Sequence, residues 1–377
     1  MEIITREKCV LNNTDDLEHL YSFKNYPVFM GCTNEDLSSD IFSDMDWYIS
    51  KSSGLIQLKN LLPFEVLYPK SHGAGSIGNI WNQHHTAFSS FLQKFKPKSV
   101  FEIGGSHGIL NSKHLDKIPW VIVDANPNPI PSCNATFIKG VFDENFNHTG
   151  DYDVIVHSHL FEHVYEPDGF VRKISSMLSD EQKMIFSVPN MEVMLKKKYS
   201  NCLNFEHTFF LTEVYVEYLL SKHGFQIIDK EYFMDDHSIF YAASKSSLVV
   251  EKNFSLDLYE LNKKTYLTYI DYYKNLVSNI NSQIKDRDNV YLFGAHIFSQ
   301  NLLSFGLDYS NIKCILDNDK NKDEKRLYGS QLFVKSPSGL ANTDRPLVIL
   351  NAGVYNNEIK KDIIDNINKS VIFLEEF

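Results

Sequence analysis

The sequence lacks the features of a membrane or nucleic-acid-binding protein. It contains no run of about 18 apolar residues, which is the length that a membrane-spanning helix needs. The opening residues 1–6 also lack the apolar core of a signal peptide, so we expect a cytoplasmic protein with no membrane partner. Basic residues are outnumbered, 37 against 48 acidic ones, and the net charge is -11. Since a phosphate backbone needs a basic face, we expect no nucleic-acid partner.

The sequence also has few cysteines, and it shows no internal repeat. Its five cysteines are scattered and odd in number, which does not fit a disulfide framework in a chain of this length. We expect free and mostly buried thiols. They are Cys9, Cys32, Cys133, Cys202 and Cys314.

Aromatic residues, by contrast, are plentiful, with 27 Phe and 20 Tyr, so a large core can form. A length of 377 residues predicts two or three domains. In the middle of the chain, apolar runs alternate with amphipathic stretches, which is typical of an α/β fold with a parallel sheet. The predicted strands are 99–103, 120–123, 152–156 and 184–188, and the predicted helices are 80–95, 168–178 and 212–223.

We therefore predict an α/β protein in three parts. Residues 1–75 form a small irregular N-terminal domain, and 76–248 form a central doubly wound Rossmann-like domain. Residues 249–377 form a linker helix and a second small α/β domain. In this last part the predicted helix is 256–284 and the predicted strands are 290–293, 312–316 and 347–350.

The most informative motif is a glycine-rich turn after the first strand of the central domain. The strand carries Glu102 near its end, and Gly104, Gly105 and Gly108 follow directly. Glycines at this point allow the backbone to approach a ligand that a Cβ atom would exclude. We therefore expect these four residues to contact a cofactor.

The next strand ends in Asp124 and Ala125, about twenty residues after Gly104. A carboxylate there can accept hydrogen bonds from both ribose hydroxyls of an adenosine ligand. The glycine spacing departs from the pattern of a dinucleotide site, and Glu102 suits a cationic methionine moiety better than a pyrophosphate. Together these features favour S-adenosylmethionine as the cofactor over a nicotinamide dinucleotide.

A third segment, 151–164, resembles the fourth strand of class I methyltransferases and the Glu-His pair that follows it. Carboxyl ends of strands line the ligand crevice in such sheets, so we expect His157 and His159 near the cofactor. For His163 a structural hydrogen bond is the expected role. Ser76, in the glycine- and serine-rich loop 71–78, is a further predicted cofactor residue.

The order of the parts resembles the three-domain deoxysugar C-methyltransferases of sugar-nucleotide biosynthesis. In that family a small N-terminal domain binds zinc through two Cys-x-x-Cys pairs. Here the matching positions are Cys9, Asn12, Ser50 and Ser53, so three of the four thiolates are missing. We therefore expect no metal.

The family also carries a Tyr-His-Glu-His motif whose last histidine is the expected base. The matching segment here ends in Glu206 and His207, whereas Asn204 stands at the first position of the motif. The resemblance implies that His207 is the base and Glu206 orients it, with Asn204 near the substrate. The segment around His237 resembles a second substrate-facing segment, and His159 and His237 are alternative bases.

The C-terminal segments 290–296 and 315–319 resemble the family's third domain, which helps to hold the nucleotide end of the sugar substrate. The resemblance implies substrate contacts at Tyr68, Gly294, Asn351 and Tyr355. The alternative is that this domain is a docking scaffold with no ligand.

Loss of the tyrosine and first histidine from the motif removes groups that carbon methylation would use. We therefore predict an enzyme that transfers a methyl group from S-adenosylmethionine to a hydroxyl of a nucleotide-linked sugar. Methylation at carbon of a keto-sugar nucleotide is the alternative enzyme reaction. It needs a base to remove a C–H proton next to the ketone, and groups that stabilise the resulting enolate. A catalytically idle cofactor-binding partner protein is the alternative of another class, and a homodimer is the expected assembly.

Overall fold

The computed structural model describes residues 3–68, 78–255 and 257–375. These residues form two compact units, which differ from the predicted division at residues 75 and 248, because the N-terminal segment is shared between both units. The first unit takes Met1–His19, Tyr48–Met194 and Glu206–Asn262, and the second takes Leu20–Trp47, Leu195–Phe205 and Lys263–Phe377.

The first unit is built on a seven-stranded sheet, which confirms the predicted central α/β domain. All four predicted strands are present, and β13 runs antiparallel to both of its neighbours while the other pairs are parallel. In order across the sheet, the strands are β12 (Phe225–Phe233), β13 (Ser238–Lys245), β11 (Lys183–Pro189), β10 (Val154–Ser158), β7 (Val100–Ile103), β8 (Trp120–Asp124) and β9 (Thr136–Lys139).

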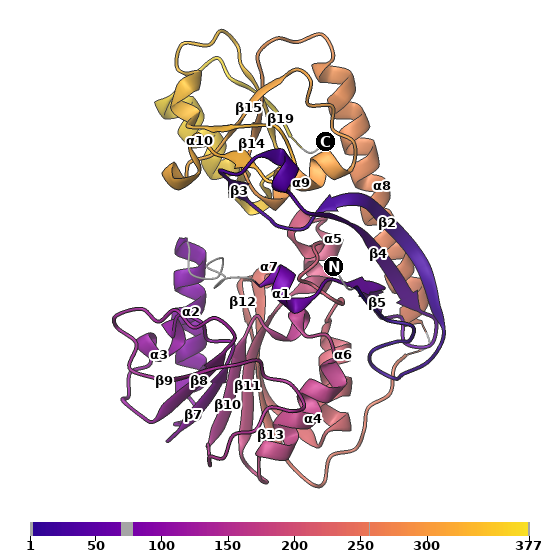
Figure 1. The fold of residues 1–377 in the computed structure, drawn as a ribbon, viewed down its shortest axis with the longest axis vertical. Coiled ribbons are helices and arrows are strands. Elements are labelled where there is room, and N and C mark those ends of the chain that lie inside the picture. The colour runs from indigo at the N-terminus through magenta and orange to yellow at the C-terminus, as the bar shows by residue number, and fades with distance from the viewer. Residues whose placement is uncertain (1–2, 69–77, 256, 376–377) are drawn as a thin grey trace. The chain divides into compact units, whose positions relative to one another are not determined.

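Helices cover both faces of this sheet, as Figure 1 shows. One face packs against α2 (Asn79–Gln93) and α3 (Ile109–Lys113), in a core that includes Phe88 and Leu110. On the other face, the ring of Phe170 in α4 (Pro167–Met177) lies 5.3 Å from that of His157. Helix α6 (Glu213–Lys222) contacts α4. Both faces are thus removed from water, as the continuous apolar runs of the strands predict.

The path of the chain through the sheet locates a ligand crevice. The chain starts the sheet at β7, continues to β8 and β9 on one side, and then returns to β10 on the other side of β7. Ligands bind outside the carboxyl ends of the strands at such a reversal. The residues that follow these two ends are Gly104 and His159.

The N-terminal segment contains more regular structure than predicted. Its two main strands are β2 (Leu17–Pro27) and β4 (Phe42–Ser50), which form a three-stranded sheet with β5 (Ile56–Leu58). The burial of β2 does not alternate, so the period-two signal of a strand is weak in that part of the sequence. The shorter elements of this segment are β1 (Ile4–Thr5), which pairs with β6 (Asn60–Leu61), and α1 (Phe64–Leu67). Two further short helices, α5 (Met191–Lys196) and α7 (Met234–His237), lie later in the chain.

The four positions that match the family's zinc ligands include two pairs of neighbours. The thiol of Cys9 lies 3.3 Å from the hydroxyl of Ser53, and the backbone N–H of Ser53 donates to the hydroxyl of Ser50 at 3.3 Å. Asn12 donates instead to the hydroxyl of Ser52 at 3.0 Å. Hydrogen bonds between small polar side chains therefore hold this corner together.

The second unit contains a five-stranded sheet in which every pair is parallel. The chain enters at β14, builds outward through β15 and β17, and returns to β18 beside β14, so a second reversal point lies between β14 and β18. The strands in order are β17 (Val334–Lys335), β15 (Ile312–Leu316), β14 (Val290–Phe293), β18 (Leu347–Leu350) and β19 (Ile372–Leu374).

Helices α9 (Ile297–Ser304) and α10 (Asn356–Asn366) follow β14 and β18 in the chain, and β3 (Cys32–Thr33) pairs with β16 (Arg326–Leu327). The long helix α8 (Leu258–Ile284) agrees closely with its prediction. Among the residues that the structure describes, no helix is both long and apolar enough to cross a membrane.

Candidate active site

The glycine loop after β7 has little room for side chains. Gly104 and Gly108 both have positive φ angles, +75° and +66°. A Cβ atom at Gly105 would come within 2.8 Å of the carboxyl group of Glu102, and one at Gly108 would meet the sulfur of Cys133 at 2.2 Å. The loop therefore needs glycine for its own backbone and packing as well as for the approach of a ligand.

Asp124 lies beside this loop, at the carboxyl end of the neighbouring strand. One of its carboxylate oxygens accepts a hydrogen bond from the backbone N–H of Ser106 at 3.0 Å, and the other accepts from that of Asn126 at 2.7 Å. A carboxylate has about four lone-pair positions, so capacity remains for two ribose hydroxyls. The side-chain amide of Asn126 donates to the carbonyl of Tyr68 at 2.9 Å, which brings Tyr68 to this edge next to Ala125. The arrangement fits an adenosine ligand.

Glu102 is turned into the interior, in contrast to the open position expected beside a methionine moiety. Its side chain is only 4% exposed, and it accepts a hydrogen bond from the indole N–H of Trp120 at 2.8 Å. Burial raises the pKa of Glu102 to about 7; the hydrogen bond from Trp120 opposes this rise, and the charge of Asp124 adds to it. The carboxyl group thus supports the glycine loop from below.

This raised pKa predicts a pH-dependent stability that Glu102→Gln removes. Between about pH 4.5 and 7 the folded state holds this proton more tightly than the unfolded state, so the free energy of unfolding falls as the pH rises. Above pH 7 the loss in the free energy of unfolding that Glu102 causes is complete, and it amounts to about 3 kcal/mol. We expect Glu102→Gln to gain stability relative to the natural chain on going from pH 5 to pH 8, as measured by urea unfolding. The exposed Glu251→Gln is the matched control, and an equal difference at both pH values would contradict the assignment.

A chain of polar side chains crosses the edge of the sheet at the carboxyl end of β10 and the amino end of β13. The imidazole of His159, a residue with a positive φ of 46°, places Nδ1 3.5 Å from a carboxylate oxygen of Glu162. Its Nε2 lies 2.8 Å from the hydroxyl of Ser238, and that hydroxyl lies 2.6 Å from Nδ1 of His237. Two hydrogen bonds thus join His159, Ser238 and His237, and the carboxylate of Glu162 faces His159 at a longer distance.

The direction of the hydrogen bonds follows from the buried carboxylate. Glu162 is 1% exposed, and its carboxylate, 3.5 Å from Nδ1 of His159, favours the tautomer that carries the N–H at Nδ1 and the lone pair at Nε2. The hydroxyl of Ser238 then donates to His159 and accepts from Nδ1–H of His237. In this assignment Nε2 of His237 carries a lone pair at the end of the network, so it is able to accept a proton.

Two aromatic residues of α2 form a wall beside this network, and the sequence analysis missed both. The ring centroid of Trp81 lies 4.9 Å from that of His159 and 5.1 Å from that of His237. The ring of His84 lies 5.0 Å from His159, and burial lowers the pKa of His84. Their spacing of three residues places Trp81 and His84 on one face of a helix, which is a signal that the sequence contained.

His157 does not lie in the crevice, contrary to expectation. It is fully buried on the sheet face opposite α2, and it stacks on Phe186 at a centroid distance of 4.8 Å. Burial lowers the pKa of His157 to about 3, so the ring is neutral. The end of β10 at Ser158 explains the difference. Alternation alone would place His157 and His159 on one face, but His159 follows the strand with a positive φ of 46°, which redirects its side chain.

The predicted pair Glu206 and His207 lies next to His163. The imidazole Nδ1 of His163 is 3.0 Å from the carbonyl oxygen of Glu206 and 3.2 Å from the hydroxyl of Tyr68. The rings of His163 and His207 have centroids 5.2 Å apart, and the carboxylate of Glu206 lies 3.9 Å from Nδ1 of His163. Burial lowers the pKa of His163 to about 4, so this ring is neutral as well. Glu162 completes the group, with an oxygen 3.6 Å from Nε2 of His163.

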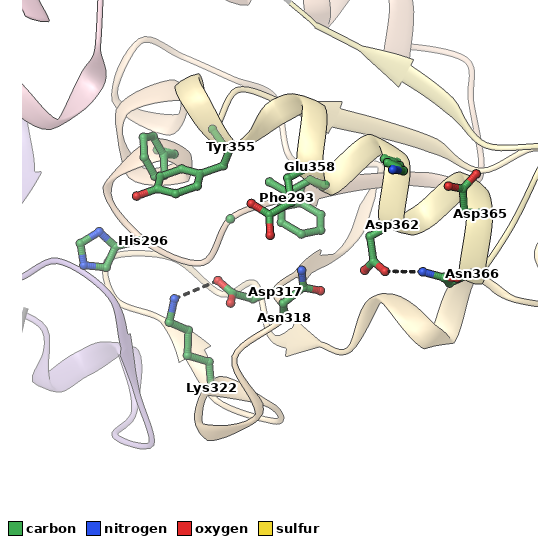
Figure 2. A pocket seen from close by; sticks show the side chains of 15 residues that line it. Phe293, His296, Asp317, Asn318, Lys322, Tyr355, Glu358, Asp362, Asp365 and Asn366 are labelled. Atoms are coloured by element: carbon green, nitrogen blue, oxygen red, sulfur yellow. Dashed lines mark hydrogen bonds and ion pairs between the residues drawn. The ribbon is translucent and has the colours of Figure 1, made fainter. Parts of the chain in front are cut away.

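The second unit has a pocket of its own, of about 570 Å³, at the carboxyl ends of its strands (Figure 2). Asp317 follows β15 and accepts a hydrogen bond from the backbone N–H of Ala295 at 2.9 Å and one from Lys322 at 2.9 Å. This repeats the contact of Asp124 with the loop after β7. The predicted residues Gly294 and Tyr355 both line the pocket, together with Phe293, His296, Phe298, Asn318, Ala352, Glu358, Ile359, Lys361, Asp362, Asp365 and Asn366.

Three predicted residues lie elsewhere. Asn351 is 6% exposed and does not line the pocket of the second unit. Asn204 is buried in the second unit, where its amide donates to the carbonyl of Asn201 at 3.1 Å. Ser76 lies outside the residues that the structure describes.

Comparison with known proteins gives one family match. Residues 81–230, less than half of the chain, match the model of a family described as a methyltransferase domain. The matched segment contains the glycine loop, Asp124 and the turn from His159 to His163. No curated protein matches the chain.

Several solved structures are similar over part of the chain. A putative O-methyltransferase from Nostoc punctiforme PCC 73102 is 16% identical, with a TM-score of 0.36 over 43% of this chain and 56% of that chain. Magnesium protoporphyrin IX methyltransferase from Synechocystis PCC 6803, solved with bound SAH, is 15% identical, with a TM-score of 0.36 over 45% and 85%. Human N-acetylserotonin methyltransferase in complex with SAM is 14% identical, with a TM-score of 0.37 over 45% and 53%. The match thus spans little more than half of the first of these structures.

Proposed function

We propose that residues 81–230, which match the model of a methyltransferase domain, act as a class I methyltransferase domain, and that the protein transfers a methyl group to a hydroxyl of a nucleotide-linked sugar. S-adenosylmethionine is the cofactor of this class of domain, as the glycine loop and Asp124 predicted. The observation that carries the proposal is the relay from Glu162 to His237, because a hydroxyl acceptor needs a base of this kind.

The first unit supplies the groups that hold the cofactor. The backbone after Gly104 and the carboxylate of Asp124 face the crevice between β7 and β10, where they can bind the adenosine part. The bound cofactor supplies an electrophilic methyl group on a sulfonium. The side chain of Leu160 comes within 3.1 Å of the Cβ position of Gly104, so the turn that carries His159 packs directly on the cofactor loop.

The relay can remove the acceptor proton in concert with attack. Nε2 of His237 takes the hydroxyl proton, while its own Nδ1 proton passes to Ser238 and the hydroxyl proton of Ser238 passes to His159. The positive charge then lies beside the carboxylate of Glu162. His207, which the family resemblance implies as the base, is the second candidate.

The pocket of the second unit supports a nucleotide-linked acceptor. Asp317 repeats the relation of Asp124 to a glycine-containing turn, an arrangement that suits ribose hydroxyls. Lys322 supplies a positive charge at the same pocket. We propose that this pocket binds the nucleotide part of the substrate.

The test is turnover with S-adenosylmethionine and a panel of nucleotide-linked sugars, including hexoses, heptoses and their 4-keto forms. We expect a mass gain of one methyl group on a non-keto sugar, together with release of S-adenosylhomocysteine. Methylation of keto-sugars alone, with deuterium exchange into the substrate before transfer, would show carbon methylation instead. Tight binding of the cofactor without turnover on any member would support an idle binding module.

A further inference from the structure

Glu162, His163 and His207 form a cluster that the relay does not fully use. One potential ligand atom from each of the three residues lies within 4.8 Å of the other two. The side chains come from two segments, the turn after β10 and the loop that precedes α6. We propose that these three side chains form a binding site for a divalent transition-metal ion such as Zn²⁺.

The separation of the ligand atoms fits an ion better than a hydrogen bond. Nε2 of His163 lies 3.6 Å from the nearest carboxylate oxygen of Glu162, which is too long for a normal N–H···O bond. Two ligands that share a tetrahedral zinc ion at about 2.1 Å lie about 3.4 Å apart. Two imidazoles and one carboxylate are also a ligand set that zinc uses at catalytic sites.

The orientation of His163 supports the same conclusion. Its Nδ1 faces the backbone carbonyl of Glu206 at 3.0 Å, so this nitrogen carries the proton and donates. The lone pair is then on Nε2, directed toward Glu162. A hydrogen bond from the distal ring nitrogen to a backbone carbonyl is the usual outer-shell support of a metal-binding histidine.

Glu162 itself requires a positive partner. It is 1% exposed, and one of its carboxylate oxygens is buried without a hydrogen-bond partner among the residues that the structure describes. Within the same residues, its other oxygen has long contacts to His159 at 3.5 Å and to His163 at 3.6 Å. A buried carboxylate is costly unless it is paired or coordinates a metal, and an ion among the three side chains removes that cost.

The backbone holds the two segments in register. The N–H of Thr208 donates to the carbonyl of Glu162 at 3.0 Å, which links the loop of His207 to the turn of His163. The guanidinium of Arg6, itself 5% exposed, donates to the carbonyl of Thr208 at 2.6 Å and to that of Tyr165 at 2.5 Å. The site is therefore built before an ion arrives, which favours affinity.

Three protein ligands leave at least one coordination position open. An oxygen of the acceptor has the chemistry to occupy it, and this last step rests on the proposed transfer to a hydroxyl. Binding of the ion does not depend on it. In this arrangement His207 is a metal ligand, and His237 remains the base.

The experiment measures Zn²⁺ binding to the full chain after chelator treatment, without cofactor or acceptor, by competition with a chromophoric chelator. We expect one Zn²⁺ per chain, and an intense visible spectrum typical of low coordination number when Co²⁺ replaces it. Glu162→Gln, His163→Gln and His207→Gln should each weaken binding more than about 100-fold, since even an outer-shell partner is worth about 10–100-fold. The controls are His19→Gln and Glu65→Gln, two exposed residues of the same unit.

Three outcomes would overturn the site: no stoichiometric binding, retention of binding in all three variants, or equal loss in the controls. The Co²⁺ spectrum of the natural chain gives an answer even if a variant does not fold. Turnover is measured separately on the same samples. Stoichiometric Zn²⁺ binding without turnover would support the metal site and contradict the proposed function. Full turnover by metal-free protein that takes up no Zn²⁺ would support the proposed function and contradict the metal site.

Discussion

Asp124→Ala should weaken the binding of S-adenosylmethionine by about 100-fold or more. The carboxylate is placed to accept two hydrogen bonds from the ribose, and a bond to a charged group is worth about 1.5–3 kcal/mol. Each 1.4 kcal/mol corresponds to about tenfold in affinity. The variant also leaves the backbone N–H groups of Ser106 and Asn126 without their acceptor, which loosens the glycine loop. Isothermal titration with S-adenosylmethionine and with S-adenosylhomocysteine measures both affinities.

Two further variants separate charge from fold. Asp124→Asn keeps one acceptor oxygen and should lose about tenfold, because the bond that it retains is uncharged. Asp180→Ala removes an exposed carboxylate of the same unit and should bind the cofactor as the natural chain does. Ligand-induced stabilisation in a thermal melt provides an independent readout, since only a chain that binds is stabilised. If Asp124→Ala binds with unchanged affinity, the adenosine site must lie elsewhere.

His237→Ala should lower kcat by about 10²–10⁴-fold, which is the typical contribution of a general base. Affinity for S-adenosylmethionine should change less than twofold, because the side chain lies in the relay and not at the glycine loop. Ser238→Ala cuts the relay but leaves the base in place, so we expect a loss of about tenfold, the size of one neutral hydrogen bond. Steady-state release of S-adenosylhomocysteine with a substrate from the panel measures kcat.

His207→Gln provides the comparison that separates the two histidines. As a metal ligand it should lose activity together with bound Zn²⁺, whereas His237→Ala should lose activity and keep its metal. The exposed His19→Ala should match the natural chain in both measurements. If His207→Gln retains its metal while kcat falls more than in His237→Ala, the base is His207 and the relay has another role.

The sequence predicted the parts of the fold that depend on short-range pattern. Apolar runs of four or five residues locate the central strands because both faces of the sheet are covered, so each buried strand is continuously hydrophobic. The glycine loop and Asp124 were recognisable for a related reason, since their chemistry is carried by residues close together in the chain. Strand β2 escaped prediction because its buried residues do not alternate, whereas β4 has a period-two pattern from Met45 to Ile49 that the sequence contained.

The histidine network could not be predicted, because its members meet only through the sheet. Ser238 lies 79 residues from His159 in the sequence, and the two are joined because β13 inserts antiparallel beside β11. The contact of His163 with the segment of Glu206 and His207 escaped prediction for the same reason, since 43 residues separate His163 from Glu206. Local pattern suggested a structural role for His163 and gave no sign that Glu162 would be buried beside it.

The packing beneath the cofactor loop has a consequence for how such sequences can diverge. The carboxyl group of Glu102, the indole of Trp120 and the missing side chain at Gly105 share one small volume. A larger residue at position 105 is tolerated only if position 102 shrinks, and a shorter residue at 102 leaves the indole N–H of Trp120 without its acceptor. We therefore expect substitutions at positions 102, 105 and 120 to occur together, so that a search for distant relatives should consider the three positions jointly.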